Sequence, residues 1–542
     1  MQADEETPLL AEAQQNGSTP NGHDEQDAAP WQGNENEALK PQASIAAVIV
    51  PMMLGIFLIA MDQTIVASTY AAIGSEFEHL ENTSWIATGY MLTLTSFQPL
   101  YGKLSDIFGR KSCMIFAYFV FAIGCLFCGL ANSMSSLIAA RALAGIGGGG
   151  IGTVGVIIMS DVVPLRNRGT WQGVANIIFA SGQATGAPLG GFLADMIGWR
   201  WAFLVQVPMT LLALTSVAFG LKLPSSDNAD FKAKLKRVDF AGALTLVVCV
   251  FSLLLGLDRG GNIAWSDPIT IACFVVFGVL FVAFLLIEWR FASEPFAPKH
   301  IATNPSLLAC YLTNYFLIGA TMIVIFHVSL FLQAVRGFDP SKTGLALLPA
   351  VIGGGIGSVS CGLIMKATGR YYALTIAVSL LSCTGMFIIA GVTGPFLFTL
   401  AGLGAGLAMM NLGGWATLTS TLIALIANAG PENQAVATAV SYLFRSLGSV
   451  VNLSIATTLF QEKLRTRLHE RLTGADVEKA RPFIISRVRE SLDYVHKLDP
   501  ITRAAVVSSY SDATQVALWF AVALAGVAVC CTPFIKEKSL AR

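Results

Sequence analysis

Two charged residues, Asp62 and Arg141, stand inside apolar stretches and are the first candidates for chemistry. Asp62 interrupts the run GIFLIAMDQTIV, and Arg141 lies in LIAARALAGIGGGG. An ionised side chain at the centre of a bilayer costs roughly 2.5–3.5 kcal/mol on insertion scales, so it must face water, pair with an opposite charge or be neutralised. We predict that Asp62 takes a proton and a cationic substrate in turn, and that Arg141 holds a nearby acid or polarises a proton path. The alternative for each is a fixed structural ion pair.

Three polar residues in one later apolar stretch are further candidates. His327 lies inside it, and an imidazole with an ordinary pKa of about 6.5 suits a proton relay; a satisfied core histidine is the alternative. Asn314 and Tyr315 come earlier on the same stretch. They line a cavity or hydrogen-bond a neighbouring helix. Arg445, in a later stretch, is expected to lie nearer the end of its span and to extend toward the membrane surface.

The elements that carry these residues are apolar helices. Of the 542 residues, 54% are hydrophobic and 13% charged, against about 25% charged in soluble domains. About 20 apolar residues suffice to cross a bilayer, and we predict an all-α membrane protein surrounded by lipid. The predicted spans are fourteen: 45–70, 85–104, 112–131, 135–159, 173–195, 201–223, 239–257, 268–289, 308–333, 343–365, 373–391, 395–426, 434–459 and 513–535.

Basic residues set the predicted orientation. With a cytosolic N-terminus, eighteen Lys and Arg residues lie on the cytosolic side and four in the short opposite loops, as the positive-inside rule requires. Both termini then face the cytosol. The long loop 461–512 lies on the other side. Its residues Val488, Leu492 and Val495 share one helical face, which indicates a helical lid or surface-lying segment, or a plain spacer.

The N-terminal tail, 1–42, is acidic and polar and is predicted to be disordered. It contains Glu5-Glu6-Thr7-Pro8-Leu9-Leu10. In this stretch Glu5, Leu9 and Leu10 resemble an acidic dileucine sorting signal, which implies a sorting adaptor as partner; a chance match is the alternative. The zero net charge gives no indication of a nucleic-acid partner.

No recognisable cofactor or catalytic motif is present. Gly145, Gly147 and Gly150 match G-x-G-x-x-G, but they lie in an apolar helix and not after a strand, so helix packing is expected. The sequence has no G-x-x-x-x-G-K-[ST], H-E-x-x-H or G-x-S-x-G. We therefore expect no cofactor, no metal site and no enzymatic activity.

An internal repeat indicates two related halves. Gly102-Lys103-Leu104-Ser105-Asp106-Ile107-Phe108-Gly109-Arg110-Lys111 follows the second span. Gly362 and Gly369-Arg370 follow the tenth, 260 residues later, and such symmetry is typical of transporters. The first copy resembles the signature loop of the major facilitator superfamily, which implies a gating role for Gly102, Asp106, Gly109, Arg110 and Lys111. Lys366 stands where the second copy would repeat the acid.

Further motifs resemble the same family in the right order. They are Asp62-Gln63-Thr64-Ile65-Val66, Arg141, the six-residue loop GWRWAF at 198–203, and the antiporter motif with Gly182, Gly186, Pro188, Gly190 and Gly191. The first resembles fourteen-span drug:proton antiporters. Three departures weaken that drug-exporter match: Ala187 occupies the usual proline place, and Ala67 and Ala72 stand where the drug exporters carry Asn and Pro.

The resemblance implies a domain plan around a midplane site. It comprises the tail 1–42, an N-terminal six-helix half 43–223, a linker with two extra helices 224–290, and a C-terminal six-helix half 291–535. A cytosolic tail, 536–542, follows, and we expect a monomer.

Residues 84–111 look most similar to fungal vacuolar basic amino acid transporters. This resemblance implies a proton-coupled antiporter that moves Lys, Arg and His from the cytosol into the vacuole. A plasma-membrane pump for drugs or metabolites is the alternative, and a nutrient sensor with a transporter fold is a further one.

Overall fold

The computed structural model describes residues 45–77, 84–221, 240–262, 265–290, 301, 303–338, 340–394, 398–472 and 498–540. All of these ranges belong to one compact unit, Leu39–Arg542. The dileucine stretch, with Glu5, Leu9 and Leu10, and the loop residues Val488, Leu492 and Val495 lie outside the described residues. Within the described ranges the secondary structure is helical throughout, with no strand.

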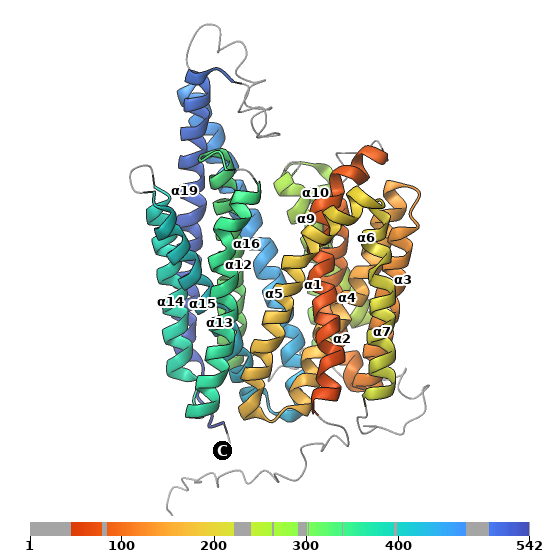
Figure 1. The fold of residues 1–542 in the computed structure, drawn as a ribbon. Coiled ribbons are helices and arrows are strands. Elements are labelled where there is room, and N and C mark those ends of the chain that lie inside the picture. Colours follow the sequence, from red (N-terminus) through yellow and green to blue (C-terminus); the bar gives the residue numbers. More distant parts are fainter. Residues whose placement is uncertain are drawn as a thin grey trace, which may run out of the picture. The chain divides into compact units, whose positions relative to one another are not determined.

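Each predicted span corresponds to a long helix, so the expected all-α membrane fold is confirmed (Figure 1). The sixth span is broken into two pieces, and eleven of the described helices are long and apolar enough to cross a membrane. The helices are α1 (Ile45–Glu76), α2 (Ser84–Phe108), α3 (Arg110–Gly129), α4 (Met134–Val162), α5 (Leu165–Met196), α6 (Arg200–Leu204), α7 (Gln206–Gly220), α9 (Phe240–Asn262), α10 (Pro268–Arg290), α12 (Pro305–Ala334), α13 (Pro340–Thr368), α14 (Tyr372–Val392), α15 (Leu400–Ala429), α16 (Gln434–Arg471) and α19 (Pro500–Cys531).

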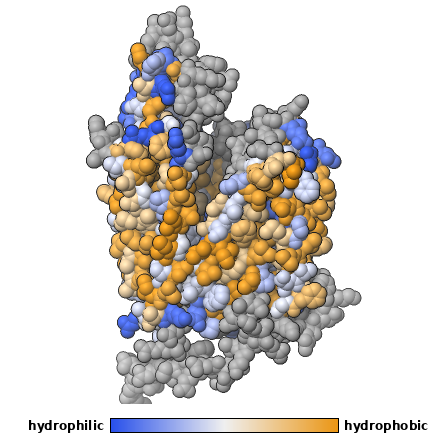
Figure 2. All heavy atoms as spheres, viewed as in Figure 1, coloured by the Kyte–Doolittle hydropathy of each residue, from blue (hydrophilic) through white to orange (hydrophobic). Residues whose placement is uncertain are grey.

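The helices form two bundles joined along two seams. Helices α1 to α7 pack on one another, as do α12 to α16 with α19. Helix α5 packs against α13, and α2 against α16; α9 and α10 pair and contact α2 and α16 through α9 (Figure 1). Apolar side chains form a band across the middle of the helices, and hydrophilic ones gather toward their ends (Figure 2). This band matches the apolar interior of a bilayer.

The glycine run of α4 lets neighbouring helices approach closely. A methyl group at Gly147 would lie 2.7 Å from the carbonyl oxygen of Ala117 on α3, and one at Gly149 would lie 2.6 Å from that of Leu94 on α2. Small residues at helix contacts are how membrane helices gain van der Waals packing. The G-x-G-x-x-G match is therefore a packing surface, as predicted.

The first seam, between α5 and α13, is tight near the end that the charge pattern assigns to the cytosol. There Gly169 meets Gly362 backbone to backbone, because a methyl group on Gly169 would lie 2.9 Å from the Cα atom of Gly362. Two turns further along α5, Asn176 Nδ2 donates to Ser358 Oγ at 2.6 Å.

The second seam is closed at the same end by Gln434, the first residue of α16. Its amide nitrogen donates to Asp161 Oδ1 at 2.9 Å, and its amide oxygen accepts from Arg168 Nη1 at 3.1 Å. One turn further, Ala439 packs directly on Gly102 of α2. In the described residues, the two halves are thus joined at the ends that the charge pattern assigns to the cytosol, and we call this arrangement cytosol-closed.

Helices α16 and α19 run further than their apolar stretches predict. The loop was expected to begin at 461 and end at 512, but α16 continues to Arg471 and α19 already begins at Pro500. The extensions are amphipathic: Leu464, Leu468 and Tyr510 are buried between them. On the outside, Arg467 and Arg471 both pair with Asp512. Residues between 472 and 498 lie outside the described ranges.

Candidate functional site

Asp62 of α1 and Arg141 of α4 form an ion pair inside the N-terminal bundle. Arg141 Nη1 lies 2.8 Å from Asp62 Oδ1 and 2.7 Å from Oδ2. The Asp62 side chain is 0% exposed and that of Arg141 1%. The structure therefore brings together the two leading sequence candidates, 79 residues apart in the chain, as partners. Arg141 is seven residues from Met134, the non-cytosolic start of α4, or about 10 Å along the helix.

Two further residues complete the polar contacts of this pair. Gln206, the first residue of α7, donates from Nε2 to Asp62 Oδ1 at 3.1 Å. Arg141 Nε donates to the carbonyl oxygen of Ile86 on α2 at 3.2 Å. Sequence reasoning missed Gln206, although a lone amide directly after the GWRWAF loop in an apolar span was a usable signal. The pair thus links α1, α2, α4 and α7.

Aromatic rings enclose the guanidinium. Its central carbon lies 4.3 Å from the ring centre of Tyr90 and 5.6 Å from that of Phe203, distances at which a cation is attracted to the ring face. The hydroxyl of Tyr90 is buried and has no hydrogen-bond partner in the described residues. Nothing in the sequence distinguished Tyr90 from the other aromatic residues of the spans.

The antiporter motif on α5 positions the helix that carries Asp62. A methyl group at Gly182 would lie 2.5 Å from the carbonyl oxygen of Phe57, and one at Gly186 would overlap Thr64 Oγ1 and the Met61 carbonyl. Thr64 Oγ1 in turn donates to the Gln183 carbonyl at 3.0 Å. These contacts hold α1 against α5 on either side of Asp62. The remaining motif residues lie further along the same helix: Pro188, Gly190 and Gly191.

The signature loop is built around Arg110, the first residue of α3. Gly109 adopts φ +88°, a conformation that favours glycine, and it turns the chain from α2 into α3. Arg110 pairs with Asp106 one turn back on α2 and with Asp161 Oδ2 at 3.0 Å. Lys111 is half-buried beside it.

Asp161 connects this loop to the other half of the molecule. It accepts from Arg110 through one oxygen and from Gln434 of α16 through the other. The loop is thereby joined to the closed cytosolic seam. Its predicted gating role remains a prediction, and this shared carboxylate is the physical link that such a role requires.

His327 on α12 is remote from this cluster in the second bundle. Its Nδ1 lies 2.9 Å from the Ile323 carbonyl oxygen, which assigns the proton to Nδ1. The ring packs against Phe460 at 5.4 Å between centres. Its buried Nε2 has no hydrogen-bond partner in the described part of the chain. Among the described residues, no Asp, Glu, Lys or Arg side chain hydrogen-bonds to this imidazole, so a proton relay through it has no partner there.

Asn314 and Tyr315 also lie in the second bundle. Asn314 donates to Ser441 Oγ at 3.1 Å and accepts from Thr421 Oγ1 at 2.9 Å, so it ties α12 to α16 and α15. Tyr315 is half-buried and packs edge-on against Phe444. Of the two alternatives for Asn314, the structure shows hydrogen bonding to neighbouring helices.

Arg445 lies well inside α16, the helix of its predicted span. It was predicted to lie near the end of its span, but it is eleven residues beyond Gln434, or about 16 Å along the helix. That is about half of a ~30 Å hydrocarbon layer. Its Nη2 donates to the Leu418 carbonyl of α15 at 3.3 Å.

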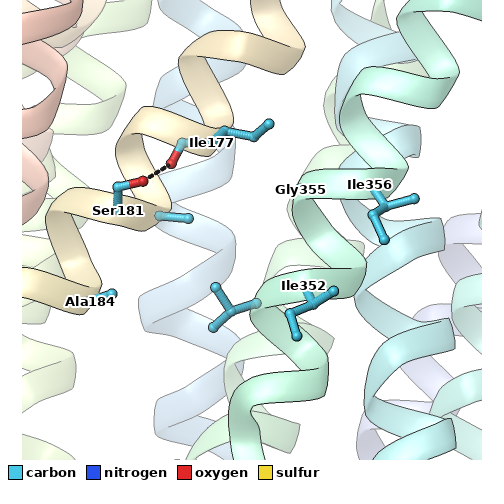
Figure 3. A pocket seen from close by; sticks show the side chains of 8 residues that line it. Ile177, Ser181, Ala184, Ile352, Gly355 and Ile356 are labelled. Atoms are coloured by element: carbon cyan, nitrogen blue, oxygen red, sulfur yellow. Dashed lines mark hydrogen bonds between the residues drawn. The ribbon is translucent and has the colours of Figure 1, made fainter.

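A cavity of about 350 Å³ lies between α5 and α13, just beyond their tight contact (Figure 3). Its lining is apolar except for Ser181, whose hydroxyl donates to the Ile177 carbonyl. Ile352 is 60% exposed beside it, so the cavity is a crevice that opens at the surface between the two helices. Among the described residues no group of three or more His, Cys, Asp or Glu side chains lies close enough to hold a metal ion.

Several known proteins are similar to this chain in sequence. The chain is 36% identical over 505 residues to the vacuolar membrane amino acid uptake transporter fnx2 of Schizosaccharomyces pombe (92% of this chain, 85% of the relative). It is 39% identical over 472 residues to multidrug resistance protein fnx1 of the same yeast (86% and 88%). It is 31% identical over 466 residues to vacuolar basic amino acid transporter 1 of Saccharomyces cerevisiae (78% and 79%).

The fold is similar to a solved structure of the proton:xylose symporter XylE, with a TM-score of 0.57 and 13% identity over 91% of this chain and 96% of that one. A model of the Major Facilitator Superfamily matches residues 52–452. The resemblance of the signature motifs is confirmed by these matches, and the chain belongs to the major facilitator superfamily of membrane transporters.

Proposed function

We propose that this transporter is a proton-coupled antiporter that moves Lys, Arg and His from the cytosol into the vacuole. The substrate class and compartment rest on fnx2 and vacuolar basic amino acid transporter 1, whose names describe vacuolar uptake of amino acids. The observation that carries proton coupling is the sealed Asp62–Arg141 pair at membrane depth. Protons leaving the acidic vacuolar lumen would drive the exchange.

The chemistry of the pair explains how one proton could change the conformation. When Asp62 takes up a proton, its carboxyl group becomes neutral and Arg141 loses its balancing charge. A buried guanidinium without a counter-charge is costly, so protonation destabilises the arrangement of α1 and α4 seen here relative to another one. A proton can shift the conformational equilibrium only through such a difference between two states.

Of the two ligands considered for Asp62, its burial favours the proton over the amino acid. Because its side chain is fully buried and shares Arg141 and Gln206, it is not open to a substrate in the cytosol-closed conformation. We assign it the proton and not the amino acid. The pair occupies the non-cytosolic part of the bundle, the side from which the driving proton would arrive.

The test compares the wild type with Asp62→Asn, Arg141→Met and the double variant in vacuolar membrane vesicles. We expect Asp62→Asn alone to lose about 3–5 kcal/mol of stability, because it leaves Arg141 unpaired. The double variant removes both charges and should regain most of that loss. We expect the double variant still to exchange labelled for unlabelled arginine across the membrane. It should not accumulate arginine when ATP is added. In the wild type, ATP should drive this accumulation and a proton uncoupler should abolish it.

If the double variant still accumulates arginine at the wild-type level when driven by protons, the Asp62–Arg141 pair has a structural role only.

The second candidate function is export of drugs across the plasma membrane, which the 39% identity to multidrug resistance protein fnx1 favours. Wild-type vesicles that accumulate none of the three amino acids but do accumulate cationic drugs would support that function instead.

A further inference from the structure

Arg445 is a cation at mid-membrane depth on the seam between the two halves. Its neighbour in the chain, Ser446, donates to Gln98 Oε1 of α2 at 3.1 Å and so places this level of α16 against the N-terminal half. On its own side, the polar network of Asn314, Thr421 and Ser441 lies one helical turn nearer the cytosol. Arg445 lies one turn beyond Ser441 on α16, next to the residue that contacts α2.

The charge of Arg445 has no counter-charge in the described residues. No described carboxylate lies within 4 Å of it, whereas Arg141, another guanidinium inside an apolar helix, is paired with Asp62. Its contacts are the neutral Leu418 carbonyl and the ring of Tyr442, whose centre lies 4.9 Å away. Its Nε–H is buried and has no hydrogen-bond partner among the residues that the structure describes.

A half-buried arginine with an unused donor has a definite chemical preference. The planar guanidinium presents N–H groups in a fork that matches the two oxygens of a carboxylate. A charge at this depth is tolerated when it faces a cavity or a partner. A transported ligand that carries a carboxylate would supply that partner during the cycle.

The proposed substrates carry such a group, and cationic drugs in general do not. Lys, Arg and His each have an α-carboxylate beside their positive charges, and the half-buried ring of Tyr315 packs against Phe444, directly before Arg445. Aromatic faces attract cations. This stretch of α16 thus carries an anion-binding group, Arg445, with the ring of Tyr442 at 4.9 Å and the aromatic Phe444 next to it in the chain.

We propose that Arg445 binds the α-carboxylate of the transported amino acid and so selects amino acids over amines of the same shape. This rests on the proposed function. The proton site at Asp62 and the carboxylate site at Arg445 then lie in different halves, so that proton and substrate are bound by separate groups.

The first test uses wild-type vesicles and labelled arginine. Unlabelled arginine, arginine methyl ester and agmatine, which is arginine without its carboxyl group, are the competitors. We expect the ester and agmatine to compete roughly tenfold to a hundredfold more weakly than arginine, since a hydrogen bond to a charged group contributes about 1.5–3 kcal/mol. Equal competition by agmatine would overturn the assignment. Sodium acetate, added in excess, separates a substrate site from a general anion site: inhibition by acetate as strong as by arginine would also overturn it.

The second test uses variants. Arg445→Met should raise the KM for arginine by a similar factor and remove the preference over agmatine, and Arg445→Lys should retain part of both. Arg336→Met is the matched control, because Arg336 lies at the end of α12 over the ring of Phe398, and it should leave KM and preference unchanged. An Arg445→Met protein that keeps the wild-type preference contradicts the inference. If that variant fails to fold, the wild-type competition series decides.

Two results with wild-type vesicles distinguish the proposed transport function from the proposed role of Arg445. Wild-type vesicles that take up no basic amino acid overturn the proposed function together with the carboxylate site. Wild-type vesicles that accumulate arginine but accept agmatine equally well overturn the role of Arg445 alone.

Discussion

At the scale of single residues, the buried Asp62–Arg141 pair is a weak source of stability, as the proposed proton coupling requires. The carboxylate accepts from Arg141 and Gln206 while excluded from water. Desolvating two charges costs several kcal/mol per ion, which their attraction only partly returns, and apolar replacements of such pairs are often neutral or stabilising. Such a pair has two energetically distinct states, because adding one proton removes the attraction without removing the buried guanidinium.

A second residue, Glu76, gives a pH-dependent prediction at the non-cytosolic end of α1. The Trp199 indole donates to it at 2.6 Å and Arg200 pairs with it at 2.7 Å. The Trp199 hydrogen bond, followed by Arg200, lowers the pKa of Glu76 below its ordinary value of 4.5. A lowered folded-state pKa contributes stability above the unfolded value and loses it as pH falls through the folded value.

We therefore expect the thermal midpoint of the purified protein to fall below about pH 4.5, and to fall less in Glu76→Gln. Above pH 5 the wild type should be the more stable of the two. Glu462→Gln, which removes an exposed carboxylate on the α16 extension, controls for general charge effects. Parallel pH profiles of wild type and Glu76→Gln would show that this contact contributes nothing.

At the scale of helices, the contact of α1 with α5 is the element that positions Asp62. A methyl group at Gly186 would overlap Thr64 Oγ1 and the Met61 carbonyl oxygen, and the carbonyl belongs to the backbone and cannot move aside alone. Adding side-chain volume to a packed site usually costs about 1–3 kcal/mol. The antiporter motif is thus a geometric device in this chain: its glycines set the distance between two helices.

Gly186→Val should lower the thermal midpoint in detergent, and Thr64→Ala should not restore it, because the Met61 carbonyl remains. Gly278→Val on α10 is the control, since a methyl group there meets nothing within 4 Å. Equal midpoints for Gly186→Val and Gly278→Val would mean that α1 and α5 are not held at this distance.

Apolar runs were enough to predict the helices but not their ends. All fourteen predicted spans contain a helix, because bilayer thickness fixes the length of apolar sequence required. The extension of α16 to Arg471 was missed because its ion pairs and its buried Leu464 and Leu468 carry no transmembrane signature.

At the scale of the whole molecule, the site depends on pairings that sequence spacing does not reveal. Motif resemblance singled out Asp62 and Arg141 one by one, yet their contact follows from how α1 and α4 pack. Conversely, His327 stood out as an intramembrane histidine, but the packing of α12 puts it among aromatic rings in the other bundle. Residue type indicates which groups can titrate, and tertiary packing decides which of them meet.

Gln434 holds the two halves together at their closed ends, because its side chain bonds both to Asp161 and to Arg168 of the N-terminal half. Gln434→Ala removes these bonds and should shift the protein toward a cytosol-open state. The reporter is Ser358→Cys, a fully buried position on the seam. A membrane-impermeant thiol reagent added from the cytosolic side should label it faster in the Gln434→Ala background.

Ser382→Cys controls for general loosening, since Ser382 is equally buried but bonds to Met410 within its own half. Its labelling should stay slow in both backgrounds. If Gln434→Ala accelerates both reporters alike, the variant has loosened the fold and not opened the seam; if it accelerates neither, the glycine contacts alone keep the cytosolic end closed. Selective labelling at 358, reversed by excess substrate on the opposite side, would identify Gln434 as a latch whose release is coupled to transport.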